Sequence, residues 1–231
     1  MTSVANGIRV AIDGPSGSGK SSVSKKVAAH LGIGYLDTGA MYRALTWYCL
    51  DRGIDLDDLG AVAEAVTAMP LEMGTDPSAP SISMGGTRID TDIRTTRIAE
   101  VVSKVATNLQ VRPKLQQRQR ELMAQIAADQ GGVVAEGRDI TTVVAPDADV
   151  RILMVASEAA RLARRSKELH GGADDAAIAA TRTQIVDRDK ADSTVSSFMS
   201  AADGVVTLDT SDLTFQQSVE AVLTLVERAR G

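Results

Sequence analysis

Cysteine is almost absent from this 231-residue chain, which has a single one, Cys49. One cysteine cannot form a disulfide within the chain, so the sequence favours a reducing compartment such as the cytoplasm. The chain also has no apolar run of 18 residues, so we expect no membrane span. Its first ten residues have no basic segment followed by an apolar one, and we expect no secretory signal there.

Aromatic residues make up only 3% of the chain, and the net charge is −5, from 25 basic and 30 acidic residues. Sequence-independent binding of polymeric nucleic acid needs a broad basic face, and single strands are stacked on aromatic rings. We therefore expect no polymeric nucleic acid as a partner. The arginines nevertheless gather in three segments, 112–120, 161–165 and 182–188, which could bind a small, highly charged anion.

Short apolar segments alternate with segments of helical spacing along most of the chain. We expect five strands, at 8–13, 34–37, 132–137, 149–157 and 204–209. We expect helices between and after them, at 20–31, 40–53, 157–170 and 214–230. This alternation predicts an α/β fold with a five-stranded parallel sheet and helices on both faces.

Two segments interrupt the alternation. Residues 70–110 contain turn residues and short strand-like stretches before a helix, which predicts a small antiparallel insert. Residues 170–200 are rich in Gly, Asp and Ser around a charged helix, which predicts a helical lid. The core of this single unit would then consist of residues 1–69, 111–169 and 201–231.

The stretch "GPSGSGKSS" matches the phosphate-loop motif G-x-x-x-x-G-K-[ST] between a predicted strand and a predicted helix. Its glycines let successive backbone N–H groups point at an anion, and the helix start adds partial positive charge. Lys20 could reach the β and γ phosphates, and the Ser21 hydroxyl could bind Mg²⁺. The predicted ATP-binding loop consists of Gly14, Pro15, Ser16, Gly17, Ser18, Gly19, Lys20, Ser21 and Ser22.

The loop by itself does not identify a reaction, because GTPases, motor ATPases and small-molecule kinases all have one. A GTPase would be expected to carry an N-K-x-D motif that binds the base. The chain has no such motif, which argues against a GTPase-like switch.

The stretch "YLDTGAMYR" could contribute to a second substrate site. The Thr38 hydroxyl, the amides of the helix start and Arg43 could face one anion, with Tyr42 packed against it. Alternatively, Thr38 only caps the helix and Arg43 lies on a solvated face. The local pattern leaves both interpretations open.

The stretch "VVAEGRDI" places polar residues at the carboxyl end of a strand, where α/β sheets bind their ligands. Glu136 could hold a Mg²⁺-bound water. Arg138 could bind a phosphate with two N–H groups, and Asp139 could accept from an exocyclic amine such as that of cytosine. A local Arg–Asp pair at a turn is the alternative.

Arginines also recur in the predicted lid and in the helix before it. Arg161, Arg164 and Arg165 share or adjoin one helix face, and residues 182–192 add further arginines and aspartates. Such runs are commonly solvated faces, which we expect for Arg182. A lid that closes over phosphates would bring cations to the transferring group and exclude water, the competing acceptor.

Taken together, the motifs resemble those of the bacterial cytidylate kinases, within the adenylate-kinase-like nucleoside monophosphate kinases. The resemblance runs in order through "IDGPSGSGKS", "LDTGAMYRA", "SKVATNLQVRPKLQQRQREL", "AEGRDITTVVAPDADV", "SEAARLARR" and "DRDKADS". It implies a P-loop NTPase fold and a cytoplasmic monomer that transfers the γ-phosphoryl group of ATP to CMP or dCMP with Mg²⁺. It also implies that the insert enlarges the monophosphate-binding part.

The resemblance further implies roles for individual residues. The catalytic cations would be Lys20, Arg138 and Arg188. The acceptor nucleotide would be bound by Thr38, Tyr42, Arg43, Ser103, Arg112, Arg138, Asp139, Arg188 and Asp192. Arg161 and Arg165 would join the ATP side, and the metal would be bound through Ser21 and Glu136.

Within the acceptor set, Ser103, Arg112 and Asp139 would lie nearest the cytosine, and Asp192 would face the ribose. The local pattern alone does not single out Ser103 or Arg112. The chain departs from the family after Asp192, where the segment is about two residues shorter and lacks an arginine that would help to hold the acceptor phosphate. Phe198-Met199 stands where the family has a Pro-Leu pair.

Two alternatives to CMP phosphorylation follow from the same residues. A kinase of the same fold could act on UMP or another small acceptor. A family member that has lost activity with the lid arginine could serve as a nucleotide-binding regulator.

Overall fold

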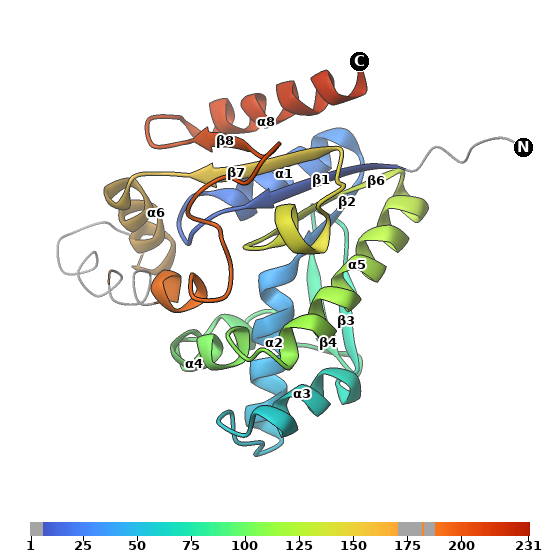
Figure 1. Cartoon of the computed structure of the whole chain (residues 1–231), viewed down its shortest axis with the longest axis vertical. Coiled ribbons are helices and arrows are strands. Elements are labelled where there is room, and N and C mark those ends of the chain that lie inside the picture. Colours follow the sequence, from blue (N-terminus) through green and yellow to red (C-terminus); the bar gives the residue numbers. More distant parts are fainter. Residues whose placement is uncertain (1–6, 171–181, 183–187) are drawn as a thin grey trace, which may run out of the picture.

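The computed structural model describes residues 7–170, 182 and 188–231 (Figure 1). Five strands form one parallel sheet in the order β2-β6-β1-β7-β8. Their bounds are Ile8–Asp13 for β1, Gly34–Asp37 for β2, Gly132–Gly137 for β6, Val150–Val155 for β7 and Val206–Asp209 for β8. The predicted α/β fold of the P-loop type is confirmed, with β7 and β8 a little shorter than expected.

Helices cover both faces of this sheet (Figure 1). Helices α1 (Lys20–Leu31) and α8 (Phe215–Arg230) pack on one face, and α5 (Val111–Gln130) packs on the other. The inner strands are buried on both faces, because both faces meet helices. This explains why the sequence of β6, "GVVAEG", is a continuous apolar run broken only by Glu136 near its end.

A second, antiparallel sheet lies in the lower part of the molecule in Figure 1, within the predicted insert. Its strands are β3 (Leu71–Gly74), β4 (Ser81–Met84) and β5 (Thr87–Arg88). The chain then passes through a 3-10 turn, η1 (Asp92–Arg94), into α4 (Thr96–Ala106). The antiparallel insert predicted from its turn residues has therefore formed.

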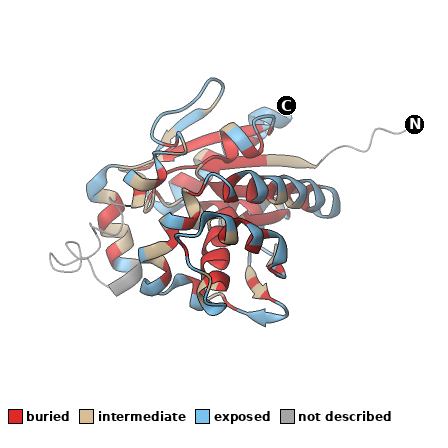
Figure 2. Cartoon of the chain, turned by 60° about the horizontal axis from the view of Figure 1, so that its bottom comes forward, coloured by how far each residue is buried: buried red, intermediate tan, exposed pale blue. Residues whose placement is uncertain are grey.

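The insert shares its core with helices that precede it. Helices α2 (Thr38–Asp51) and α3 (Leu59–Ala68) bury side chains in the same cluster as β4, α4 and the start of α5. The single tryptophan, Trp47, packs against this cluster from α2. Figure 2 shows the buried residues of this part as an inner layer with exposed residues outside.

The remaining described elements are α6 (Glu158–His170), after β7, and a π-helical turn η2 (Ile140–Val144), after β6. Residues 188–192 are helical, and residues 193–205 lead back to β8. Most of the predicted lid, 170–200, lies outside the described residues, so its bounds and those of the core and insert remain predictions. Across the ranges described, no helix combines the length and apolarity needed to cross a bilayer.

Candidate functional site

The carboxyl ends of the three neighbouring strands β2, β6 and β1 bring acidic residues to one edge of the sheet. Asp37 is in register with Glu136, and Asp13 is in register with Gly137. Each strand runs directly into a loop or helix that carries one of the predicted motifs. The topology thus gathers motifs that are far apart in the sequence at the edge where such sheets bind ligands.

The phosphate loop connects β1 to α1 and requires glycine at its tight turns. Gly17 has a φ of 76°, and a Cβ there would lie 2.6 Å from the carbonyl oxygen of Arg161. Only glycine tolerates both the left-handed conformation and this close approach. Inside the loop, Lys20 donates from Nζ to the carbonyl of Pro15 at 3.3 Å, which keeps its ammonium group folded back over the loop.

Lys20 lies among charged groups. Burial lowers the pKa of Lys20, the carboxylate of Glu136 raises it, and Arg138 and Arg188 lower it again. A buried ammonium group beside other cations is stabilised by any anion that enters. The loop is thus charged as a phosphate site requires.

Glu136 lies where the predicted metal site would be. Its Oε1 accepts a hydrogen bond from the Tyr35 hydroxyl at 2.8 Å. Burial raises its pKa and nearby Asp37 adds to this, whereas Lys20 and a hydrogen bond from Ser21 lower it. Carboxylate and hydroxyl oxygens beside a phosphate loop are suited to Mg²⁺, which keeps most of its other ligands as water and phosphate. Among the described residues no group of three His, Cys, Asp or Glu could hold a metal by itself.

Thr38 is not the N-cap of α2, so the capping alternative considered for it is wrong. Asp37 is the N-cap, and its side chain accepts from the Ala40 amide at 2.9 Å. Thr38 instead donates from Oγ1 to the carbonyl of Glu136 at 2.8 Å. Arg43 is buried, so the solvated face proposed for it in that alternative is wrong.

Four arginines form a cluster beside the phosphate loop, Arg43, Arg138, Arg165 and Arg188, which we call the arginine cluster. Burial lowers the pKa of Arg43 to about 9, and Arg188 and Arg165 contribute to that shift. Burial also lowers the pKa of Arg188 to about 10, and the charge of Arg138 adds to that shift. Like charges held together out of water favour the binding of an anion.

Two buried aspartates are bound to this cluster and to the loop. Asp189 pairs with Arg138 at 2.8 Å and also with Arg161, and its Oδ1 accepts from the Ser16 amide at 3.2 Å. Asp192 lies 3.2 Å from Nε of Arg138 and 3.6 Å from Nε of Arg188. Through these contacts, Asp189 connects the phosphate loop to Arg138 and Arg161, and Asp192 connects Arg138 to Arg188.

Two of the residues predicted to lie nearest the cytosine, Arg112 and Asp139, form one buried network. Asp139 accepts from Nη2 of Arg112 at 2.5 Å and from Nε2 of Gln116 at 2.7 Å. Arg112 also donates to the Ser196 hydroxyl at 2.8 Å. This network fixes the Asp139 carboxylate in place through hydrogen bonds from two residues of one helix.

Ser103 is bound to Asp192 instead, whereas Tyr42 lies near Asp139. Ser103 donates from Oγ to Asp192 at 3.4 Å, which connects α4 to the helical residues 188–192. Burial raises the pKa of the Tyr42 phenol, and the charge of Asp139 contributes to that shift. The predicted acceptor residues come from α2, α4, α5, the turn after β6 and the helical residues 188–192.

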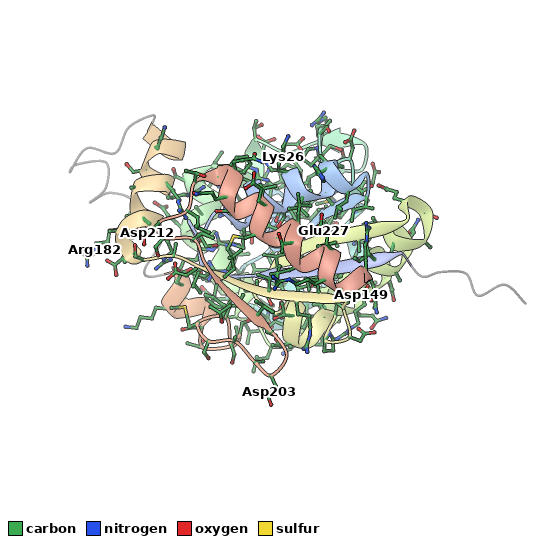
Figure 3. All side chains as sticks on the ribbon, turned by 90° about the horizontal axis from the view of Figure 1, so that it is seen from above. Lys26, Asp149, Arg182, Asp203, Asp212 and Glu227 are labelled. Carbon is green, nitrogen blue, oxygen red and sulfur yellow. The ribbon has the colours of Figure 1, made fainter. Side chains whose placement is uncertain are left out.

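The predicted ATP-side residue Arg161 and its neighbour Arg164 reach different parts of the phosphate loop. Arg161 donates from Nη1 to the carbonyl of Ser16 at 2.9 Å, so it lies against the phosphate loop. Its neighbour Arg164 reaches the carbonyl of Ser18 at 3.2 Å and the hydroxyl of Thr210, and so ties the loop to the end of β8. Arg182, expected on a solvated face, is exposed, pairs with Glu158 and points away from the body in Figure 3.

Asp13 is a buried residue of this site that the sequence motifs did not identify. Its carboxylate accepts from the amides of Ile140 and Thr141, at 3.0 and 2.8 Å, and from the Thr141 hydroxyl at 2.6 Å. It thereby joins the last residue before the phosphate loop to the turn that follows Arg138. The same signal that pointed to Glu136, an acid at the end of a buried strand, would have found it.

Asp13 predicts a specific pH dependence of stability. Burial raises its pKa from 3.8 to about 6 despite its three hydrogen bonds. The folded protein holds this proton more tightly than the unfolded chain. The protonated carboxyl therefore contributes fully to the free energy of unfolding below pH 4, and this contribution is lost as the pH rises through 6. We expect the free energy of unfolding of wild type to fall relative to that of Asp13→Asn by about 2 to 3 kcal/mol between pH 4 and 7.

Urea unfolding of both proteins between pH 4 and 7 measures the difference between their free energies of unfolding. The effects of other titrating groups are common to both proteins and cancel in this difference. Asp129→Asn, at an exposed position near the end of α5, is the matched control and should show no such trend. A constant difference between wild type and Asp13→Asn would contradict the prediction.

Comparison with known proteins gives one consistent family. A family model described as Cytidylate kinase matches residues 10–228. A protein of Streptomyces avermitilis named Cytidylate kinase is 49% identical to this chain, over 96% of the chain and 94% of that protein. Proteins of the same name from Streptomyces griseus and Streptomyces coelicolor are each 47% identical, over 96% and 98% of this chain and 93% and 96% of their own lengths.

Proposed function

This chain belongs to the cytidylate kinase family, as its motifs predicted, and on that basis we propose that it transfers the γ-phosphoryl group of MgATP to CMP or dCMP. The products would be ADP and CDP or dCDP. The enzyme is a phosphotransferase, and it needs no covalent intermediate, because phosphoryl transfer depends mostly on positioning and on neutralising charge.

The observation that carries this proposal is the arginine cluster beside the phosphate loop. Lys20 belongs to the phosphate loop, whereas Arg43 extends from α2 toward Arg188 and Arg165. The charges of Arg138 and Arg188 lower the pKa of Lys20, and the charge of Arg188 also lowers the pKa of Arg43. Such an arrangement can hold two phosphate groups end to end, as a kinase must.

We assign the donor phosphates to the backbone N–H groups of the loop and to Lys20, with Arg161 and Arg165 on the same side. Arg43 and Arg138 would hold the acceptor phosphate, and Arg188 would bridge to the group in transfer. A Mg²⁺ bound through Ser21 and Glu136 would supply additional neutralisation of the phosphate charge.

The cytosine would be recognised by the network around Asp139. A carboxylate held by Arg112 and Gln116 can accept from the exocyclic amine of cytosine, which uracil lacks. Asp192, beside Ser103, would face the ribose. This network favours CMP over UMP as the acceptor.

The experiment that tests the function is a coupled assay of ADP release with a panel of acceptors. CMP and dCMP should each stimulate release strongly, UMP weakly and other monophosphates least. Release that depends most on UMP or on a non-nucleotide acceptor would establish the alternative kinase. Tight ATP binding without any acceptor-dependent release would establish an inactive regulator.

Asp139→Asn is expected to weaken discrimination between the two pyrimidines. Losing a charge-assisted hydrogen bond costs about 1.5 to 3 kcal/mol, so KM for CMP should rise roughly tenfold to a hundredfold. The KM for UMP should change much less. Asp212→Asn, at an exposed position labelled in Figure 3, should leave both values unchanged. An equal rise for both acceptors would contradict the role of Asp139 in base recognition.

We further propose that the protein acts as a cytoplasmic monomer. Its one cysteine, Cys49, is buried in the core and free, as suits a reducing compartment. Sedimentation or light scattering at working concentration would test the oligomeric state.

A further inference from the structure

Phe198 is a large, fully buried side chain near the end of the predicted lid. None of its surface is exposed. Its ring lies against the guanidinium of Arg138, with Cζ of the arginine 4.5 Å from the ring centroid. The chain has only one other phenylalanine, Phe215, which is half exposed on α8.

The other contacts of Arg138 use most of its N–H donors. Nη2 donates to the hydroxyl of Ser16 at 3.1 Å and pairs with Asp189 at 2.8 Å. Nε lies 3.2 Å from Asp192. Nη1 is buried and has no hydrogen-bond partner among the described residues. The N–H groups of Nη1 are therefore the donors that remain for a ligand.

An aromatic ring can stabilise a guanidinium without using any of these donors. The negative face of the ring attracts the cation, and the attraction strengthens when both groups are out of water. A carboxylate in the same place would instead accept an N–H and compete with a phosphate. The contact with Phe198 thus supports the charge of Arg138 and leaves its free donors available.

We propose that Phe198 is a positioning residue for phosphoryl transfer: its ring face orients the Arg138 guanidinium so that Nη1 is left to bind the acceptor phosphate. The inference rests on the proposed function, which assigns Arg138 to that phosphate. It adds a residue that contacts no substrate and acts through Arg138 alone.

The surroundings of the ring allow this role to be tested by substitution. Because no part of Phe198 is exposed, a larger ring would require its neighbours to move, so the informative change is to a smaller apolar side chain. Phe198→Leu keeps an apolar side chain but removes the ring face, and we expect it to lower kcat/KM for CMP roughly tenfold.

Fluorinated phenylalanine separates the ring's electrostatics from its packing. In a Phe215→Leu background, Phe198 is the sole phenylalanine, so biosynthetic labelling places each analogue at position 198 only. Adding one, two and three fluorines withdraws charge from the ring face with little change of size. We expect kcat/KM for CMP to fall stepwise, by about tenfold in all, which corresponds to roughly 1.4 kcal/mol.

Two results would overturn the inference. One is a flat series across the fluorinated proteins. We expect the fluorine resonance at position 198 to shift in Arg138→Ala and not in the control Arg120→Ala. The other contrary result is a resonance that does not shift in Arg138→Ala. The resonance reports the contact between the ring and Arg138 whether or not the enzyme is active. It therefore tests this inference separately from the proposed function, which CMP-dependent ADP release by the unlabelled enzyme tests. Met199→Leu, at an exposed neighbouring position, should leave kcat/KM unchanged.

Discussion

Arg138→Ala is expected to lower kcat/KM for CMP by at least about 150-fold, or roughly 3 kcal/mol of transition-state stabilisation. The guanidinium lies between the phosphate loop and Asp192, with one nitrogen free to bind. Its removal would also take one of two cationic partners from each of Asp189 and Asp192, which keep Arg161 and Arg188. Steady-state kinetics with saturating MgATP and varied CMP measure the loss.

Two further variants test whether that loss comes from the guanidinium of Arg138. Arg138→Lys keeps the charge but not the fork of N–H donors, so it should recover only part of the activity. Arg120→Ala removes an exposed arginine of α5 that donates to the Val143 carbonyl, and its kinetics should resemble wild type. Near-normal turnover in Arg138→Ala would refute the role proposed for it.

Lys20→Met is expected to lower kcat by roughly a thousandfold, with a smaller effect on the KM for CMP. Methionine keeps much of the length and packing of lysine but cannot neutralise charge that develops on the donor phosphates. Loss of one preorganised donor to such charge reduces rates by about a hundredfold to a thousandfold, and Lys20 also carries a full charge in a buried place.

The matched control for Lys20→Met is Lys26→Met, on the same helix. Lys26 is exposed and is labelled in Figure 3. Its replacement should leave kcat and both KM values within about twofold of wild type. An equal loss of kcat in the two variants would indicate that the substitutions disturb α1, and would contradict the phosphate contact proposed for Lys20.

The strands and the phosphate loop could be predicted from sequence because their signals are local. A run such as residues 8–13, followed by the glycines of the loop, specifies strand, turn and helix start within a few residues. The insert was predictable for the same reason, since its turn residues separate short strands. The family could be named because several such motifs occur in a fixed order.

Other residues of the site could not be predicted, because their partners are distant in the chain. Asp13 contacts Thr141, which lies 128 residues further on, and no local pattern connects them. Gln116 looks like an ordinary helix residue until α5 places it beside Asp139. Phe198 drew notice only as a departure from the family, and its contact with Arg138 depends on how residues 193–205 fold back.

Trp47 gives the lower part of the molecule an optical signal of its own. It is the only tryptophan of the chain and packs in the core that α2 and α3 share with the antiparallel strands. Its fluorescence therefore reports this core alone, while circular dichroism averages over all helices and strands. Denaturation curves from the two signals will coincide only if the parallel sheet and the lower core unfold as one cooperative unit.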